Sequence, residues 1–277
     1  MPVHNNNKQI IMAKTIEFNV KTSKPFTSYL RKFAAIDSTV LFEADLLKSR
    51  FIAKSPNEER SIVKYGAISF SEAGFEVKTK ADLRIKIGIY NIGRLIKIID
   101  QFGDEFEFTI KYDEVIGNNN QKDYAAISLL LKNDELKFNN ECTSLNIFKY
   151  ISDDLYENTI RKIDEITTFD FTRDTIEKVR SLSELDKEHK LIEFRSKNGN
   201  LYAKGKSFEF LISISKCPDA NITFYKEQFD KVDVENCTVL MGTDRMLFSS
   251  NDTTSETIVS RVEGNENYEG KEEDAFN

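Results

Sequence analysis

The stretch KIGIYNIGRLIKII, from Lys86 to Ile99, decides the fold class. Its first half belongs to a β-branched run, Leu83–Tyr90, of the kind found in strands. Its second half places apolar residues at the helical spacing of three and four, and this face continues to Phe102. Gly103 follows where a helix commonly ends. The stretch therefore predicts a strand that runs directly into an amphipathic helix.

The same order stands near the start of the sequence. Lys14–Val20 alternates apolar and polar residues and predicts a strand. Pro25 then suits the first turn of a helix. Phe26 opens an apolar face with i, i+3, i+4 and i+7 spacing, and the predicted helix ends near Ile36.

The second half of the sequence repeats this order. Thr168–Phe171 predicts a strand, and Thr172 is a candidate cap for the helix that follows. Ile222–Phe224 predicts another strand, which leads into a short helix at Tyr225–Val232. Two halves with one succession of elements indicate a duplicated α+β fold: two tandem domains, each an antiparallel sheet that backs two helices.

Further strands are predicted between these helices. They lie at Val40–Glu43, Phe51–Lys54, Ser61–Phe70, Phe75–Thr79, Glu105–Tyr112, Tyr124–Leu131, Glu135–Asn139, Leu191–Ser196, Leu201–Lys204, Phe208–Ser213, Thr238–Gly242, Met246–Ser250 and Thr257–Arg261.

These patterns divide the sequence into five parts. We expect a flexible extension at 1–13, a first domain at 14–140, a connection at 141–167, a second domain at 168–263 and a mobile acidic tail at 264–277. The connection is charged and weakly periodic, which is typical of a segment that crosses between domains.

The composition excludes several classes of protein. With 40% apolar and 31% charged residues, the 277-residue chain is neither disordered nor a membrane protein. The start of the sequence has no pattern of a secretion signal, so we expect a cytoplasmic protein. The three cysteines are far apart, which predicts free buried thiols and no disulfide framework or metal site.

The outward faces of the predicted helices carry basic residues, although the net charge is −7. The first two helices are net positive, whereas the last two are nearly balanced by acids. We predict that these cations face the phosphates of DNA, which give affinity without reading sequence. The simpler interpretation is an ordinary solvated helix face, which for any single helix is the more common case. The predicted DNA-facing residues are Lys24, Arg31, Lys32, Arg94, Lys97, Arg173, Lys178, Arg180, Lys226 and Lys231.

The sequence resembles the DNA sliding-clamp family, and within it the clamps of T-even-like bacteriophages. The resemblance rests on Ser28–Ser38, Lys86–Ile99 and Ile222–Gly242, and with the element order it extends over roughly residues 14–263. It implies a polymerase processivity factor that encircles double-stranded DNA as a head-to-tail homotrimer.

The resemblance also implies the partners: a DNA polymerase, and a clamp-loader ATPase, because this chain has no phosphate-binding loop of its own. Clamps of the family receive a short apolar partner peptide beside the interdomain connection. We therefore expect that pocket between residues 141–167 and the second-domain sheet. Subunits would pair through edge strands drawn from Tyr124–Asn139 and Leu201–Ser213.

No pattern in the sequence indicates an enzyme, a metal site or a cofactor. His4 and His189 lie in a loose terminus and a charged stretch, where a solvated imidazole is the common case. Adjacent acids such as Asp153 and Asp154 are more often solvated than metal-binding. A metal-dependent nuclease, a β-rich structural or assembly protein of a virion, and a processivity factor with the clamp fold but no ring stay open as alternatives.

Overall fold

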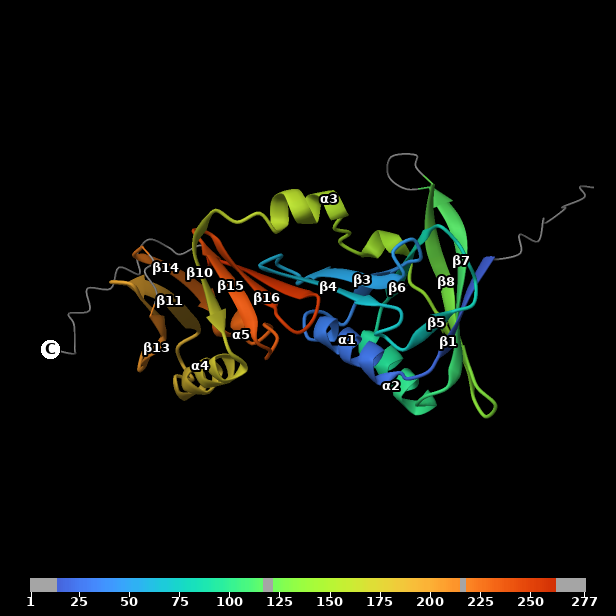
Figure 1. Ribbon diagram of the computed structural model, residues 1–277, viewed down its shortest axis with the longest axis horizontal. Coiled ribbons are helices and arrows are strands. Elements are labelled where there is room, and N and C mark those ends of the chain that lie inside the picture. The colour runs from blue at the N-terminus through green and yellow to red at the C-terminus, as the bar shows by residue number, and fades with distance from the viewer. Residues whose placement is uncertain (1–13, 117–121, 215–217, 263–277) are drawn as a thin grey trace, which may run out of the picture. The chain divides into compact units, whose positions relative to one another are not determined.

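The computed structural model describes residues 14–116, 122–214 and 218–262 (Figure 1). The predicted extension at 1–13 and the predicted tail at 264–277 lie outside these residues. The chain divides into two compact units. Unit 1 holds the described residues to Ser55 and residues 65–150; unit 2 holds residues 56–64 and those from Ile151 onward.

Unit 1 is a sheet with two helices against it. Its hydrogen-bonded strand order is β3-β2-β6-β8-β7-β1-β5, and β9 pairs with the second half of β8. All pairs are antiparallel except β6 with β8. The strands are β1 (Lys14–Val20), β2 (Val40–Asp45), β3 (Arg50–Pro56), β5 (Phe75–Val77), β6 (Arg84–Ile89), β7 (Phe106–Ile116), β8 (Lys122–Lys132) and β9 (Lys137–Glu141).

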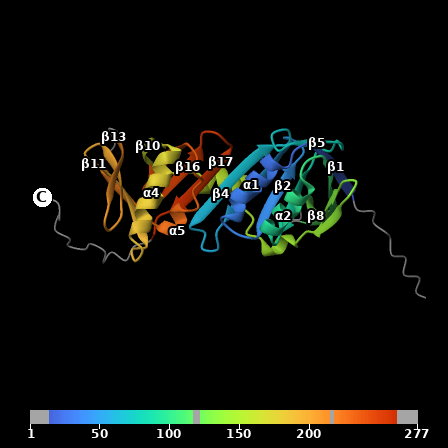
Figure 2. The same ribbon diagram turned by 90° about the horizontal axis from the view of Figure 1, so that it is seen from below.

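The helices of unit 1 are α1 (Lys24–Ala34) and α2 (Ile92–Phe102). They lie side by side (Figure 2) and run in opposite directions. The start of α1 is tied to the end of α2, since the Ser23 amide donates to the Asp104 carboxylate at 2.9 Å. The start of α2 is tied to the end of α1, since the Ile92 amide donates to the Ser38 carbonyl at 2.9 Å. Their outward faces therefore form one surface.

Aromatic rings fill the core of unit 1. Phe26 of α1 is fully buried and lies 4.7 Å from Phe51 and 4.8 Å from Phe75, centroid to centroid. Tilted and edge-on ring pairs of this kind add to the free energy of burial. The apolar spacing read in the sequence is thus the face that packs on the sheet.

Unit 2 repeats the succession with two groups of four hydrogen-bonded strands. One has the order β10-β15-β16-β17 and the other β13-β12-β11-β14, all antiparallel. The strands are β10 (Glu165–Phe171), β11 (Leu191–Lys197), β12 (Asn200–Lys204), β13 (Glu209–Ile214), β14 (Ala220–Tyr225), β15 (Cys237–Gly242), β16 (Arg245–Ser250) and β17 (Ser255–Ser260). The helices are α4 (Arg173–Leu185) and the single turn α5 (Lys226–Phe229).

The predicted strand–helix order is confirmed in both units: β1 precedes α1, β6 precedes α2, β10 precedes α4 and β14 precedes α5. One prediction was too long, because the last helix ends at Phe229 and not at Val232. Strand β4 (Ile62–Ser69) spans the division of the units, which falls between Lys64 and Tyr65.

The connection has more structure than its sequence indicates. It forms the short turns η1 (Leu145–Ile147), α3 (Asp153–Leu155) and η2 (Tyr156–Ile160), and its last residues already belong to β10. Residues up to Tyr150 group with unit 1, and those from Ile151 with unit 2.

Candidate nucleic-acid interface

Helix α1 presents a basic surface with no carboxylate of its own. Lys24 and Arg31 are exposed, and Lys32 is half-buried. The Arg31 guanidinium donates to the Thr27 hydroxyl at 3.2 Å and to the Asp100 carboxylate of α2 at 2.6 Å. Both partners of that ion pair are about half exposed (51% and 40%), so water screens it and the cation stays accessible.

Helix α2 adds two more exposed cations to the same surface. The Asn91 side chain caps the helix by accepting the Arg94 amide at 2.9 Å. The Arg94 guanidinium lies 5.7 Å from the ring centre of Phe138, which holds the side chain over β9. Lys97 is exposed one turn further along. The structure thus brings the five predicted residues of unit 1 together on one pair of helices.

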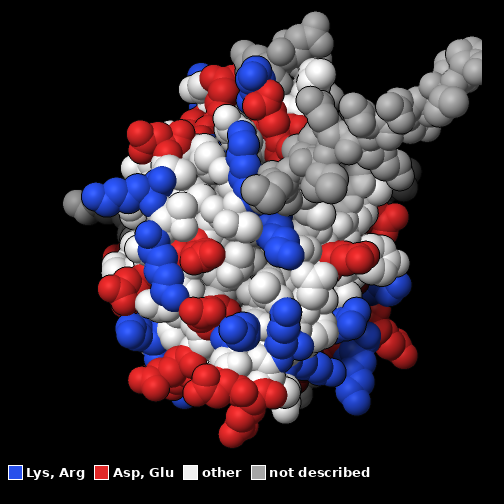
Figure 3. All heavy atoms as spheres, turned by 90° about the vertical axis from the view of Figure 1, so that its right-hand side faces the viewer, with Lys and Arg blue, Asp and Glu red and all other residues white. Residues whose placement is uncertain are grey.

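The sheet side of unit 1 differs from this helix pair. Figure 3 shows Lys and Arg interspersed with Asp and Glu over the described part of that end, with uncharged surface between them. Pairs such as Lys78 with Glu107 at 2.9 Å account for part of this mixture. Glu107 gains a hydrogen bond from Lys78, which lowers the pKa of its carboxyl. A mixed surface of this kind does not attract a polyanion as a run of cations does.

Helix α4 of unit 2 carries its cations among acids. The Thr172 hydroxyl caps the helix by accepting the Thr175 amide at 3.1 Å, as predicted for this residue. Arg173 is exposed and pairs with Glu177, one turn on, at 3.2 Å. Lys178 is exposed as well.

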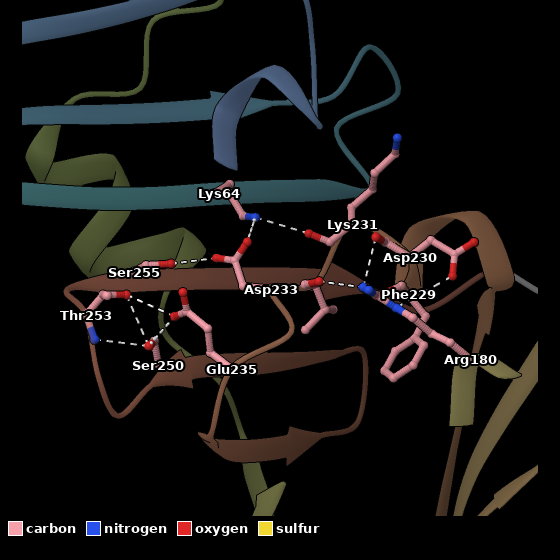
Figure 4. Close-up of polar contacts among 11 residues, drawn as sticks. Lys64, Arg180, Phe229, Asp230, Lys231, Asp233, Glu235, Ser250, Thr253 and Ser255 are labelled. Atoms are coloured by element: carbon pink, nitrogen blue, oxygen red, sulfur yellow. Dashed lines mark hydrogen bonds and ion pairs between the residues drawn. The ribbon is translucent and has the colours of Figure 1, made fainter. Parts of the chain in front are cut away.

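Two of the predicted DNA-facing residues of unit 2 hold helix ends instead of pointing freely to solvent. Arg180 of α4 reaches the residues that end α5 (Figure 4): its guanidinium donates to the Phe229, Asp230 and Val232 carbonyls at 3.1, 2.9 and 2.5 Å. Its side chain is only 20% exposed.

Lys226 of α5 contacts the end of α4 in the same way. Its ammonium donates to the Ser183 and Asp186 carbonyls, which end α4, at 2.6 Å each. Cations commonly satisfy the carbonyls that a helix leaves open at its C-terminus. Each helix of unit 2 therefore supplies the cation that caps the other.

Burial, more than ion pairing, determines the pKa shifts of Arg180 and Asp230. Burial lowers the pKa of its guanidinium, and burial likewise raises the pKa of the Asp230 carboxyl. A close ion pair would shift both in the opposite directions. The distance of 3.7 Å from the Arg180 Nε to the Asp230 carboxylate agrees with a weak pairing. The carbonyls are the main partners of this cation.

A buried ion pair that was not predicted from the sequence lies beside this site. Lys64 of β4 is 1% exposed, and its ammonium donates to the Asp233 carboxylate at 2.6 Å and to the Lys231 carbonyl at 3.1 Å (Figure 4). The second oxygen of Asp233 accepts the Ser255 hydroxyl at 2.8 Å. Lys231, itself predicted to face DNA, is half-buried. The only sequence signal was one lysine inside an apolar strand.

The second half of the connection is fastened to unit 2 through Glu256 of β17. Tyr156 is buried, and its hydroxyl donates to the Glu256 carboxylate at 2.6 Å. The Arg161 guanidinium donates to both oxygens of the same carboxylate at 2.9–3.0 Å, which raises the pKa of that arginine. A bidentate pair joined to a buried tyrosine fixes this segment firmly.

The first half of the connection packs on unit 1. The Thr143 amide donates to the Gly88 carbonyl at 2.8 Å. A Cβ atom on Gly88 would stand 2.5 Å from the ring of Phe148, so only glycine allows this approach. Large apolar side chains remain exposed along the connection: Ile147 (53%), Tyr150 (42%) and Leu155 (42%).

Metal sites, membrane spans and reactive thiols are the other features to consider in the described part of the chain. Within residues 14–116, 122–214 and 218–262, no group of three or more His, Cys, Asp or Glu is placed to hold a metal ion. In the same ranges, no helix has the length and apolar character to cross a membrane. Burial raises the pKa of the Cys142 and Cys237 thiols to about 12, so both stay protonated.

Comparisons with known proteins identify the architecture. No protein-family model and no curated protein matches the sequence. Among solved structures, the chain is similar to the PCNA2-PCNA3 complex of Sulfolobus tokodaii, with a TM-score of 0.58, 11% identity, and coverage of 90% of this chain and 99% of that one.

Two further structures were solved with a bound peptide or protein segment. The A. fulgidus PCNA bound to the C-terminal region of FEN-1 has a TM-score of 0.60, 14% identity, and coverage of 90% of this chain and 99% of that one. The Helicobacter pylori beta clamp bound to a DNA ligase peptide has a TM-score of 0.64, 12% identity, and coverage of 95% of this chain but 67% of that one. At such identities the likeness concerns architecture alone, and the chain has the α+β fold of these PCNA and beta-clamp structures.

Proposed function

We propose that this protein is a sliding clamp, which encircles duplex DNA and tethers a DNA polymerase without reading sequence. The observation that carries the proposal is the helix pair of unit 1, where five cations share one surface with a single acid, Asp100. Backbone phosphates are the natural partner of such a surface, because lysine and arginine displace condensed counterions from them. The proposal needs no catalytic residue.

Edge strands would close the ring. Strand β9 pairs on one side with β8, and β13 pairs on one side with β12; each is an edge in the described part of its sheet. Head-to-tail pairing of β9 with β13 of the next subunit would satisfy both and close after three two-domain subunits. The predicted edge ranges were too wide, since β8 and β12 have neighbours on both sides.

The connection would receive the partner. Its exposed apolar side chains suit a short apolar peptide from a polymerase or from the clamp loader that opens the ring. Two of the similar structures support this use of the fold. The A. fulgidus PCNA was solved with the C-terminal region of FEN-1, and the Helicobacter pylori beta clamp was solved with a DNA ligase peptide. We further propose a relationship to T-even-like phage clamps, on the basis of Ser28–Ser38 and Lys86–Ile99.

Solution mass and DNA topology test the proposal together. Light scattering on a closed homotrimer of 31.9 kDa chains gives about 96 kDa. With a loader, the ring stays on circular DNA and slides off linear DNA. A trimer that is never retained on circles would favour a structural protein. A smaller species that holds linear DNA would favour a processivity factor without a ring.

An edge-strand variant tests the interface. Leu211 on β13 is 45% exposed, and Leu211→Lys places a charge on the proposed contact. We expect the mass to fall to that of a monomer while the melting temperature of the chain changes little. Leu185→Lys, at a 73% exposed position on α4, is the matched control and keeps the trimer. Equal masses for both variants would remove β13 from the interface.

A further inference from the structure

The two units use their helix cations differently. In unit 1, Lys24, Arg31, Arg94 and Lys97 are exposed, and the helices carry only one acid between them. Within the described residues, Arg31 alone of these four forms an ion pair, and that pair is open to water. Phosphates could approach this surface without breaking buried contacts.

In unit 2, Arg180 and Lys226 already have partners, and most of these contacts are partly buried. Together they donate five hydrogen bonds to backbone carbonyls at the ends of α4 and α5. A phosphate that recruited either cation would leave those carbonyls open, and an unsatisfied partly buried carbonyl is costly. The cations that remain exposed on α4, Arg173 and Lys178, share the helix with three acids: Asp174, Glu177 and Glu184.

We propose that unit 1 provides most of the electrostatic grip on DNA, and that Arg180 and Lys226 are reciprocal braces that hold α4 and α5 together. The inference rests on the proposed clamp function and assigns unequal roles to its two units. A cation that caps a helix end stabilises the folded unit, whereas an exposed cation on the helix surface stabilises only the complex with DNA. Loss of a brace should therefore lower the melting temperature, and loss of a grip residue should lower the salt dependence of DNA affinity.

The test compares four double variants of the full chain, each of which removes two positive charges. The grip pair is Arg94→Ala with Lys97→Ala, and the brace pair is Arg180→Ala with Lys226→Ala. The exposed unit 2 pair is Arg173→Ala with Lys178→Ala. Lys48→Ala with Lys80→Ala is the control, at exposed positions of unit 1 away from its helices. Affinity for a labelled circular duplex is measured over a salt series, after incubation long enough for spontaneous ring opening to reach equilibrium. Thermal melting of each variant is measured without DNA.

The grip pair is expected to make the negative slope of log affinity against log salt less steep by about 1.8, at about 0.9 for each lost phosphate contact. The melting temperature of the grip pair is expected to equal that of the control pair. The brace pair is expected to melt at a lower temperature, with a slope change well under half that of the grip pair. The exposed unit 2 pair is expected to change the slope less than the grip pair does.

Equal loss of slope in the grip pair and the exposed unit 2 pair would overturn the inference while leaving the clamp function intact. Because the exposed unit 2 pair removes no brace, this comparison stands even where the brace pair fails to fold. A brace pair with the melting temperature of the wild type would also overturn the inference. A wild-type chain with no affinity for the circular duplex would instead refute the proposed function.

Discussion

Removal of the Lys64 ammonium is expected to destabilise unit 2 strongly. The perturbation is Lys64→Met, which keeps most of the buried stem and deletes the charge. In the wild type that ammonium is 1% exposed and lies 2.6 Å from the Asp233 carboxylate. Its removal leaves a carboxylate whose side chain is 18% exposed and to which the Ser255 hydroxyl still donates.

The structure sets the size of the effect. Breaking a buried ion pair from one side costs about 3–5 kcal/mol, because one charge stays buried without its partner. Asp233 keeps a hydroxyl donor and some contact with water, so we expect the lower end, about 3 kcal/mol. For a unit of this size that corresponds to roughly 6–12 °C in melting temperature. Asp233→Leu is expected to cost more, because the charge it strands on Lys64 is more deeply buried.

The assay is reversible urea unfolding of the single variants and of Lys64→Met with Asp233→Leu, with calorimetry to assign the transition of unit 2. Lys178→Met is the control at an exposed position, where a change within about 0.5 kcal/mol is expected. The double variant should recover part of the loss, since no charge is then left buried. A Lys64→Met change of less than about 1 kcal/mol, or a double variant that merely adds the single costs, would refute the reasoning.

Three shorter predictions follow from other contacts. Glu256→Gln should weaken the charged hydrogen bonds that fasten η2, and so speed tryptic cleavage of the connection by roughly tenfold, at about 1.5 kcal/mol lost. Ser207 donates to Asp186 and lowers the pKa of that carboxyl from 3.8, so its stabilisation is full above that value and is lost as the pH falls through the lower folded pKa. Ser207→Ala should therefore lower the melting temperature at pH values above about 4, and its difference from the wild type should shrink as the pH falls further. Gly88→Ala should cost about 1–3 kcal/mol in urea unfolding, because the new methyl group overlaps the ring of Phe148.

Local sequence was enough for the elements and their succession. The strand β1 and the helix α2 follow directly from hydrophobic period, because a face that packs on a sheet must be apolar at each turn. The cap at Thr172 and the glycine at 103 mark helix ends through short-range hydrogen bonds and backbone freedom. These are interactions between residues close in sequence.

The connection shows where that approach stops. Its helical turns are weakly periodic, and they are held by Glu256, about a hundred residues further along the chain. Strand pairing likewise joins distant segments, so the edge strands β9 and β13 could only be bracketed from the sequence. Long-range partners leave no periodic trace in the segment that they hold.

The sequence by itself determined a duplicated α+β chain with basic helix faces, because composition and period are local properties that each helix displays alone. Only the tertiary structure decided which cations are available. Arg94 and Arg180 look alike in the sequence, each on the outward side of an amphipathic helix. One is exposed over β9, and the other is occupied by carbonyls some fifty residues away. The partner of a charge is set by what the fold brings beside it, and that is decided by packing at long range.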